Sequence, residues 1–406
     1  MRVLLVNAFH WLKGGVERTY LDESRWLSAA GHDVAHLATQ HPQNLPSPTA
    51  EYFAPFADYS EKASLGTQLA QLPHAIWSAP AAAAMARLLE HFRPDVAHVH
   101  APSRYLTPSV FGPLQRAGVP VVMTLHDFKP WCTNRLLLAH GEICERCKGG
   151  RHWHAFTTAC VQDSRAKSAV GMFEAYVHDA RHAYRAVRLW IAPSRWVQGK
   201  ALEFGLAESV TRVLPHGVEA AAGAAVLPAG TPERYALFAG RLSAEKGVKL
   251  LPTIAKAIAP VPLLVAGDGP LGDWLVREAP ANLQRLGHLE DAALATLRAH
   301  ASVVLAPSLF VEHFGYTVAE ALLDARPVVA ARIGALPELV EHEVTGLVAT
   351  PGDVAGFAAL TKRVLEEPAA AARWGAAGRA RVLAIGDPAA HVQGLLRIYE
   401  EARACG

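Results

Sequence analysis

The chain has 406 residues, of which 51% are hydrophobic and 19% are charged. This length favours two or three domains, and the composition is that of a globular protein rather than a disordered one. The formal net charge of +2 gives no indication of the concentrated basic face that nucleic-acid binding requires, so we expect no nucleic acid partner.

The N-terminal stretch MRVLLVNAFH contains an apolar run that is too short for a signal peptide. No uninterrupted apolar stretch of about 18 residues is present, so no segment is expected to span a membrane. These features predict a cytoplasmic protein, whose five cysteines are reduced unless they bind a metal.

Short Val- and Leu-rich runs alternate with longer helical patterns along the whole chain. Strands are expected in the first half at 2–7, 33–38, 95–101, 120–126, 189–194 and 212–215. In the second half they are expected at 235–240, 262–269, 283–289, 302–308, 327–334 and 345–350. Continuous apolar runs are typical of parallel strands covered on both faces. The alternation therefore predicts an α/β fold with two doubly wound, Rossmann-like domains.

A segment rich in Gly, Ala and Pro over 216–232 is typical of a linker. We accordingly predict an N-terminal domain over 1–215, with a Cys-rich insertion at 130–162, and a second domain over 216–385. A C-terminal helix over 386–406 is expected to pack back on the first domain.

The pair Gly14-Gly15 follows the first predicted strand and precedes a helix. Backbone amides at such a position can bind an anion, and a plain tight turn explains the pair equally well. The first strand is not followed by G-x-G-x-x-G, which disfavours a dinucleotide-dependent dehydrogenase.

The stretch AGRLSAEKG, residues 239–247, follows a predicted strand of the second half. Its Arg241 and Lys246 would lie at the carboxyl end of that strand, where open α/β sheets bind ligands. A guanidinium and an ammonium together suit a diphosphate, although a solvated surface loop is the alternative.

The stretch FVEHFGYTVAEAL, residues 310–322, runs from a loop into a predicted helix. Glu312 falls in the loop and Glu320 just over one turn inside the helix. Carboxylates in these places can accept hydrogen bonds from ligand hydroxyls, or can be a helix cap and an exposed helix residue.

Four cysteines fall within the segment from 132 to 160, and two of them form a C-x2-C motif. This spacing can form a tetrahedral, structural zinc site, and four reduced thiols are the alternative. The cysteines are Cys132, Cys144, Cys147 and Cys160.

The basic stretch ARHAYRAVRLW, residues 180–190, would place Arg181, Arg185 and Arg188 on one helical face. Such a face can contact an acidic lipid surface, and a solvated face is the common alternative. This pattern is the basis for expecting peripheral contact with the inner face of a membrane.

Several motifs in order resemble the retaining GT-B glycosyltransferases of family 4. They are GRLSAEKG, AGDGP, LGHL, EHFGYTVAE and TGLVATPGD in the second half, and RPDVAHVH, TLHD, IAPS and LPHGV in the first. The resemblance covers nearly the whole chain, and the E-x7-E motif of the family matches Glu312 and Glu320. It implies two Rossmann-like domains with an interdomain cleft.

The resemblance also implies a role for individual residues. Arg241 and Lys246 would hold the diphosphate of a nucleotide-sugar, Glu320 would accept from the ribose hydroxyls, and Glu312 from those of the sugar. His126 would contact the donor sugar beside the reacting centre. The remaining donor-binding residues implied are Gly14, Gly15, Gly240, Gly287, His288, Leu289, His313, Phe314, Gly315 and Tyr316.

The function implied is that of a retaining hexosyltransferase, of the EC 2.4 class, in glycan, polysaccharide or glycoconjugate synthesis. Its partners would be a nucleoside-diphosphate-sugar and a hydroxyl acceptor, which could be a sugar, a lipid-linked molecule or a small molecule. No Asp-x-Asp motif is present, so no catalytic metal is expected. A nucleotide-sugar epimerase and a non-catalytic sugar-nucleotide-binding protein on the same fold remain as alternatives.

Overall fold

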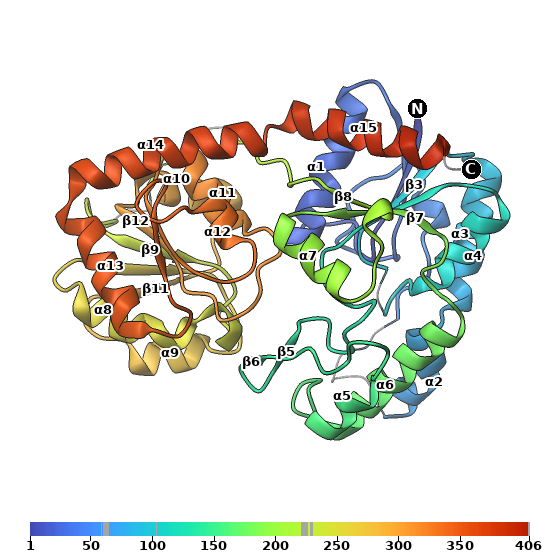
Figure 1. The fold of residues 1–406 in the computed structure, drawn as a ribbon, viewed down its shortest axis with the longest axis horizontal. Helices are drawn as coiled ribbons and strands as arrows, with labels where there is room; N and C mark the ends of the chain where they lie inside the picture. Colours follow the sequence, from blue (N-terminus) through green and yellow to red (C-terminus); the bar gives the residue numbers. More distant parts are fainter. Residues whose placement is uncertain (58, 60–64, 103, 221–225, 228–229, 405–406) are drawn as a thin grey trace. The chain divides into compact units, whose positions relative to one another are not determined.

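A computed structural model describes all 406 residues except 58, 60–64, 103, 221–225, 228–229 and 405–406. The chain divides into two compact units (Figure 1). The first unit contains Met1–His216 and Ala389–Gly406, and the second contains Gly217–Pro388. Part of the expected linker, 221–225 and 228–229, lies outside the described residues.

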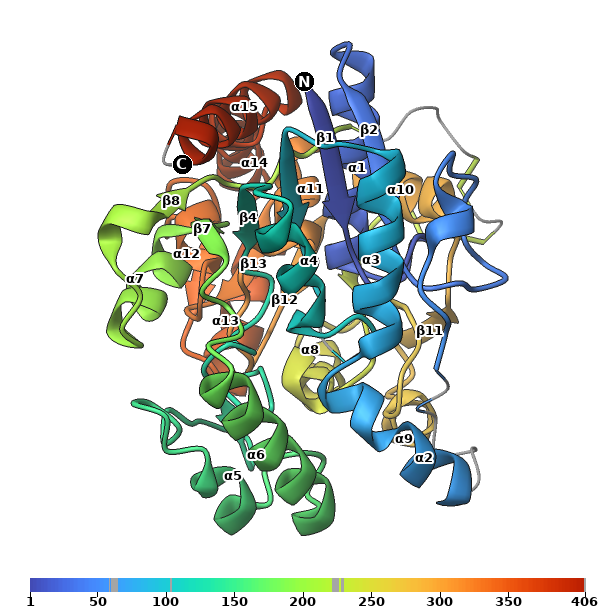
Figure 2. The ribbon, with the colours of Figure 1, turned by 90° about the vertical axis from the view of Figure 1, so that its right-hand side faces the viewer.

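The first unit is built on a parallel six-stranded sheet in the order β2-β1-β3-β4-β7-β8. The strands are β1 (Arg2–Val6), β2 (Asp33–Leu37), β3 (Val96–Val99), β4 (Val121–Thr124), β7 (Val187–Ala192) and β8 (Thr211–Val213). The helices are α1 (Gly15–Ala29), α2 (Leu65–Ile76), α3 (Ala79–His91), α4 (Phe111–Arg116), α5 (Trp153–Thr158), α6 (Arg165–Ala180), α7 (Arg195–Glu203) and α15 (Pro388–Ala404). Helices α3 and α4 pack against each other (Figure 2).

The second unit repeats this plan with the strand order β11-β10-β9-β12-β13-β14. Its strands are β9 (Ala236–Ala239), β10 (Leu263–Ala266), β11 (Leu283–Gly287), β12 (Val303–Ala306), β13 (Val328–Ala331) and β14 (Leu347–Ala349). Its helices are α8 (Leu251–Ala257), α9 (Gly272–Glu278), α10 (Asp291–His300), α11 (Tyr316–Leu323), α12 (Leu336–Leu339), α13 (Val354–Glu366) and α14 (Pro368–Ile385). The predicted α/β class with two doubly wound sheets is confirmed.

Apolar runs explain why both sheets lie inside their units. The β9 sequence ALFA is buried at every position, as expected for a strand covered by helices on both faces.

Polar caps mark several helix starts. The Ser194 hydroxyl accepts from the Val197 amide, and the Asp353 carboxylate accepts from the Gly356 amide. Helix α1, by contrast, begins at Gly15, and its N-cap residue Gly14 provides no side-chain hydrogen bond.

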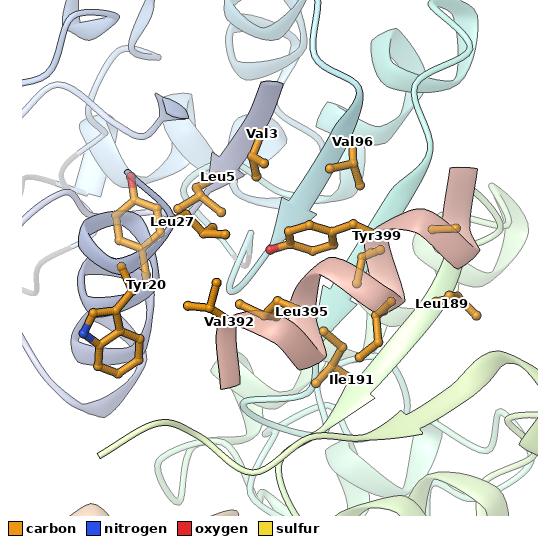
Figure 3. Close-up of a cluster of buried hydrophobic side chains, with 14 residues drawn as sticks. Val3, Leu5, Tyr20, Leu27, Val96, Leu189, Ile191, Val392, Leu395 and Tyr399 are labelled. Carbon is orange, nitrogen blue, oxygen red and sulfur yellow. The ribbon is translucent and has the colours of Figure 1, made fainter. Parts of the chain in front are cut away.

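Helix α15 belongs to the core of the first unit although it ends the chain. Its Val392, Leu395 and Tyr399 pack with Leu5 of β1 and Leu189 of β7 in one buried cluster (Figure 3). Burying a side chain of this size contributes roughly 1.5–3 kcal/mol each. The last helix is therefore an integral part of this unit.

None of the helices in the described part of the chain combines the length and the apolar character needed to cross a membrane.

Candidate active site

The strand order of the second sheet reverses at β9, which lies between β10 and β12. The loops that follow β9 and β12 leave the sheet at its carboxyl edge, beside this switch point. Open α/β sheets bind their ligands at such a place. The two loops carry the predicted site residues Arg241, Lys246 and Glu312.

Lys246 and Glu312 form an ion pair across these two loops. The Lys246 Nζ lies 2.6 Å from Glu312 Oε1, and the Ser308 hydroxyl donates to the same oxygen over 2.7 Å. The Glu312 side chain is only 14% exposed. Burial raises the pKa of its carboxyl, but the charge and hydrogen bond of Lys246 and the bond from Ser308 outweigh this, so the pKa is lowered. The site thus holds a fixed cation and an ionised carboxylate side by side.

The backbone of the two loops is held in close contact. Gly247 has a φ of +75°, and a Cβ there would lie 2.0 Å from the Pro307 carbonyl oxygen. The amides of Leu309 and Phe310 both donate to the Glu245 carbonyl oxygen, over 2.8 and 3.1 Å. Because these contacts are between backbones, Lys246 and Glu312 are fixed relative to one another by the fold.

Glu320 lies in α11 and has a different partner. Its Oε2 accepts from Arg298 Nη1 over 2.8 Å, while Arg298 Nε donates to Asp324 Oδ2 over 2.7 Å. The Arg298 side chain is buried, so it orients both carboxylates and neutralises part of their charge. The structure therefore brings Lys246 and Glu312 together but pairs Glu320 with a residue that the sequence did not indicate.

The other predicted donor residues of this unit lie in loops at the same edge. Arg241 follows β9 and Gly240, and its side chain is exposed. Gly287 is the last residue of β11, at the end of the sheet, and His288 and Leu289 follow it. His313, Phe314, Gly315 and Tyr316 connect the β12 loop to α11, with the Phe314 and Tyr316 rings 5.2 Å apart.

Three predicted site residues belong to the first unit. Gly14 and Gly15 begin α1 and are exposed. His126 follows β4, and its Nε2 lies 3.0 Å from His100 Nδ1. A cavity of about 10 Å³ lined by His100, His126 and Asp127, among others, lies at this carboxyl edge.

The four clustered cysteines are reduced, and Cys132 and Cys147 are buried. Among the described residues they do not form a group of three potential ligand atoms within 4.8 Å of one another. Their surroundings nevertheless suit a metal. The buried Nδ1 of His152 has no hydrogen-bond partner, and its Nε2 lies 2.9 Å from Asp179 Oδ2, the arrangement of a carboxylate that orients a metal-binding imidazole. The zinc site remains a proposal, with His152 as a candidate ligand that the sequence did not suggest.

The predicted basic helical face over 180–190 is wrong. Helix α6 ends at Ala180, the chain turns, and Arg188 lies in strand β7, where its Nη1 donates to the Ala402 carbonyl over 2.9 Å. Arg181 stacks on the Trp77 ring instead, 4.7 Å from its centroid. The three arginines therefore share no helix, because Arg181 and Arg185 lie in the turn and Arg188 lies in a strand that is buried at nearly every position.

Comparison with known families agrees with the fold and the two loops. The profile of Glycosyltransferase Family 4 matches residues 13–222, and that of Glycosyl transferases group 1 matches residues 224–381. The first of these covers more than half of the chain. The chain belongs to glycosyltransferase family 4, and it is a nucleotide-sugar-dependent glycosyltransferase of the hexosyl type with a GT-B fold.

Individual relatives extend over the whole chain. A glycogen synthase of Mycobacterium tuberculosis is 28% identical over 421 residues, which span 94% of this chain and 90% of that protein. A sucrose-phosphate synthase structure from Thermosynechococcus elongatus has a TM-score of 0.72 at 20% identity and covers 100% of both chains. Anabaena HepE in complex with UDP and glucose has a TM-score of 0.70 at 18% identity, over 99% of this chain and 100% of that one.

Proposed function

We propose that this enzyme transfers a glucose-type hexose from a uridine diphosphate sugar to a hydroxyl acceptor, with retention of the anomeric configuration. Support for the donor comes from the relatives: the HepE structure contains UDP and glucose, and another relative is named a 2-deoxystreptamine glucosyltransferase. Support for the site comes from the charges around the switch point of the second sheet.

Arg241 and Lys246 bind the diphosphate in this proposal. As the bond between the anomeric carbon and the phosphate oxygen breaks, negative charge develops on the leaving diphosphate, and fixed cations stabilise it. The acceptor oxygen forms the new bond to the anomeric carbon, and its proton passes to a phosphate oxygen. For this, the Lys246 side chain turns from Glu312 to the phosphates when the donor binds, and the carboxylate accepts from a hydroxyl of the sugar.

Glu320 binds the ribose hydroxyls through the oxygen that Arg298 does not hold. Amides near Gly315 at the start of α11 support the sugar, Gly15 approaches the phosphates, and the segment after Gly287 contacts the base. His126 contacts the donor sugar. The single observation that carries the proposal is the partly buried Lys246–Glu312 pair, 2.6 Å long, between the loops at the switch point.

The test is a thermal-shift screen of the full chain against UDP, GDP, ADP and TDP, followed by measurement of nucleoside diphosphate release from the matching hexose donors. We expect the largest stabilisation by UDP and a turnover that depends on an added hydroxyl acceptor. A larger stabilisation by GDP, ADP or TDP than by UDP would refute uridine as the base of the donor. Donor binding without release would instead support a non-catalytic sugar-nucleotide-binding protein, and conversion of the sugar without an acceptor would support an epimerase.

A further inference from the structure

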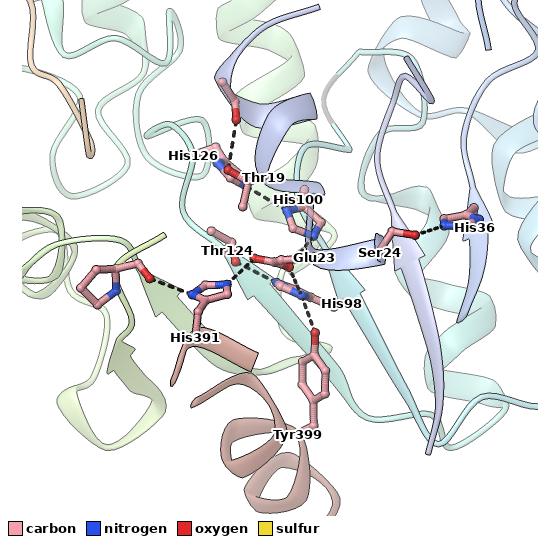
Figure 4. Close-up of polar contacts among 12 residues, drawn as sticks. Thr19, Glu23, Ser24, His36, His98, His100, Thr124, His126, His391 and Tyr399 are labelled. Atoms are coloured by element: carbon pink, nitrogen blue, oxygen red, sulfur yellow. Dashed lines mark hydrogen bonds and ion pairs between the residues drawn. The ribbon is translucent and has the colours of Figure 1, made fainter. Parts of the chain in front are cut away.

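A carboxylate with three histidines around it lies in the interior of the first unit. Glu23, in α1, is 1% exposed. Its Oε1 lies 3.0 Å from His391 Nε2, and its Oε2 lies 3.3 Å from His98 Nδ1 and 3.4 Å from His100 Nε2 (Figure 4). These partners come from β3, from the residue that follows it and from α15. A charge buried so deeply persists only when its neighbours compensate it.

The contacts of His391 define the protonation of the pair that it forms with Glu23. The Pro215 carbonyl oxygen lies 2.8 Å from His391 Nδ1 and can only accept, so Nδ1 carries a hydrogen. Burial raises the pKa of Glu23, but the nearby His100 and His98 and the hydrogen bond with His391 lower it well below its usual range. Glu23 is therefore ionised, and its Oε2 remains an acceptor.

The tautomer of His100 follows from this assignment. Its buried Nε2 lies 3.4 Å from Glu23 Oε2, and among the described residues neither atom has a hydrogen-bond partner, so the contact between them is electrostatic. Burial lowers the pKa of His100 well below its usual value, so the ring is neutral and carries one hydrogen. A lone pair on Nε2 would face the negative charge of the carboxylate, so the hydrogen belongs on Nε2, and Nδ1 becomes an acceptor.

We propose that Glu23 is a positioning residue which, through His100, fixes the tautomer of His126. His100 Nδ1 accepts from His126 Nε2 over 3.0 Å, so the hydrogen of a neutral His126 is on Nε2 and its Nδ1 is a hydrogen-bond acceptor. An acceptor nitrogen suits a donating hydroxyl group of a sugar. The benefit to transfer rests on the proposed role of His126, whereas the tautomer rests on the contacts and charges of Glu23, His100 and His126.

The surrounding hydrogen bonds make a bound metal ion the weaker explanation. Glu23, His98 and His100 are the described group whose ligand atoms come within 4.8 Å of one another. However, His98 Nδ1 lies 2.8 Å from the Tyr399 hydroxyl, and its Nε2 lies 2.7 Å from the Thr124 hydroxyl (Figure 4). Both nitrogens of His98 thus have partners, and Glu23 Oε1 has His391. Protons account for these contacts without an ion.

The tautomer can be read directly on the full chain labelled with ¹⁵N-histidine, from two-bond ¹⁵N–¹H correlation spectra at pH 7.5. A His126→Gln variant assigns the signals. We expect the wild-type spectrum to show His126 protonated at Nε2 alone, and this result does not depend on whether any variant folds. An imidazolium or an Nδ1–H form would overturn the proposal.

Glu23→Gln and Tyr399→Phe form a matched pair of variants within the same cluster. The glutamine keeps the shape but can donate to His100, so the Nδ1–H form of His126 should rise and kcat should fall about tenfold. Tyr399→Phe removes a hydroxyl that contacts His98 and not His100, so the tautomer should not change. An unchanged His126 tautomer in folded Glu23→Gln would overturn the proposal. It would also be overturned if the wild type and Tyr399→Phe contained one equivalent of a metal and Glu23→Gln did not. Full activity of His126→Gln, with the expected tautomer in the wild type, would refute only the role of His126 in transfer.

Discussion

Replacing Lys246 by alanine should affect stability and catalysis through separate mechanisms. Glu312 accepts from Lys246 over 2.6 Å and its side chain is 14% exposed, so the variant leaves a largely buried carboxylate without its cation. Breaking a fully buried pair costs about 3–5 kcal/mol. Because Lys246 is itself 32% exposed and Ser308 still donates to Glu312, we expect a smaller loss, about 1–3 kcal/mol.

The transfer rate should fall by roughly 10²–10³, the typical effect of removing one charge-stabilising group. The double variant Lys246→Ala/Glu312→Gln should recover most of the stability, because no buried charge remains, but none of the activity. Urea unfolding and nucleoside diphosphate release measure the two effects, and Lys249→Ala, an exposed lysine of the same segment, is the control. Near-normal turnover of Lys246→Ala, or no recovery of stability in the double variant, would refute this reasoning.

Three further outcomes are expected. Gly247→Ala should lose roughly 2–4 kcal/mol, measured by thermal unfolding, because its positive φ and the Pro307 carbonyl leave no room for a Cβ. Burial lowers the pKa of His152, but its hydrogen bond to Asp179 and the neighbouring Cys147 raise the pKa to about 9, so the contribution of His152 to stability is present below pH 6.5 and is lost as the pH rises through 9. Asp179→Asn should therefore lose on the order of 1 kcal/mol at pH 6, and its stability between pH 6 and 9 should vary less than that of the wild type. If the cysteine cluster binds zinc, freshly reduced protein should contain one equivalent, and a chelator should lower the melting temperature; protein without zinc would reject the site.

The fold could be predicted from the sequence because its signal is local. Continuous apolar runs of Val, Leu and Ala encode strands covered on both faces, and helical patterns between them imply parallel sheets. The prediction of a basic helix over 180–190 was wrong because it followed the helical spacing of three arginines. Leu189 and Trp190 belong instead to a buried strand. The order of the strands depends on contacts between distant segments, and no local pattern indicates it.

The candidate site was only partly visible in the sequence. Charged residues after predicted strands indicated the loops of Lys246 and Glu312, because the carboxyl ends of parallel strands share one edge. Arg298 gave no such signal: it lies inside an amphipathic helix, and its pairing with Glu320 depends on how α10 packs beside α11. Glu23 was missed for the same reason, since its partners come from β3 and from the last helix of the chain.

One alanine of the second unit has a backbone conformation that favours glycine. Ala325 has a φ of +56°, and Gly375 packs closely against its carbonyl oxygen. A left-handed alanine stores roughly 1–2 kcal/mol, so Ala325→Gly should stabilise the second unit slightly.

The most direct test of the proposed donor site is a crystal structure of the full chain with UDP bound. We predict that the diphosphate lies within hydrogen-bond distance of Arg241 and Lys246, with the ribose hydroxyls on Glu320. A nucleotide bound elsewhere, or bound with Lys246 still paired to Glu312 and both cations away from the phosphates, would contradict the account.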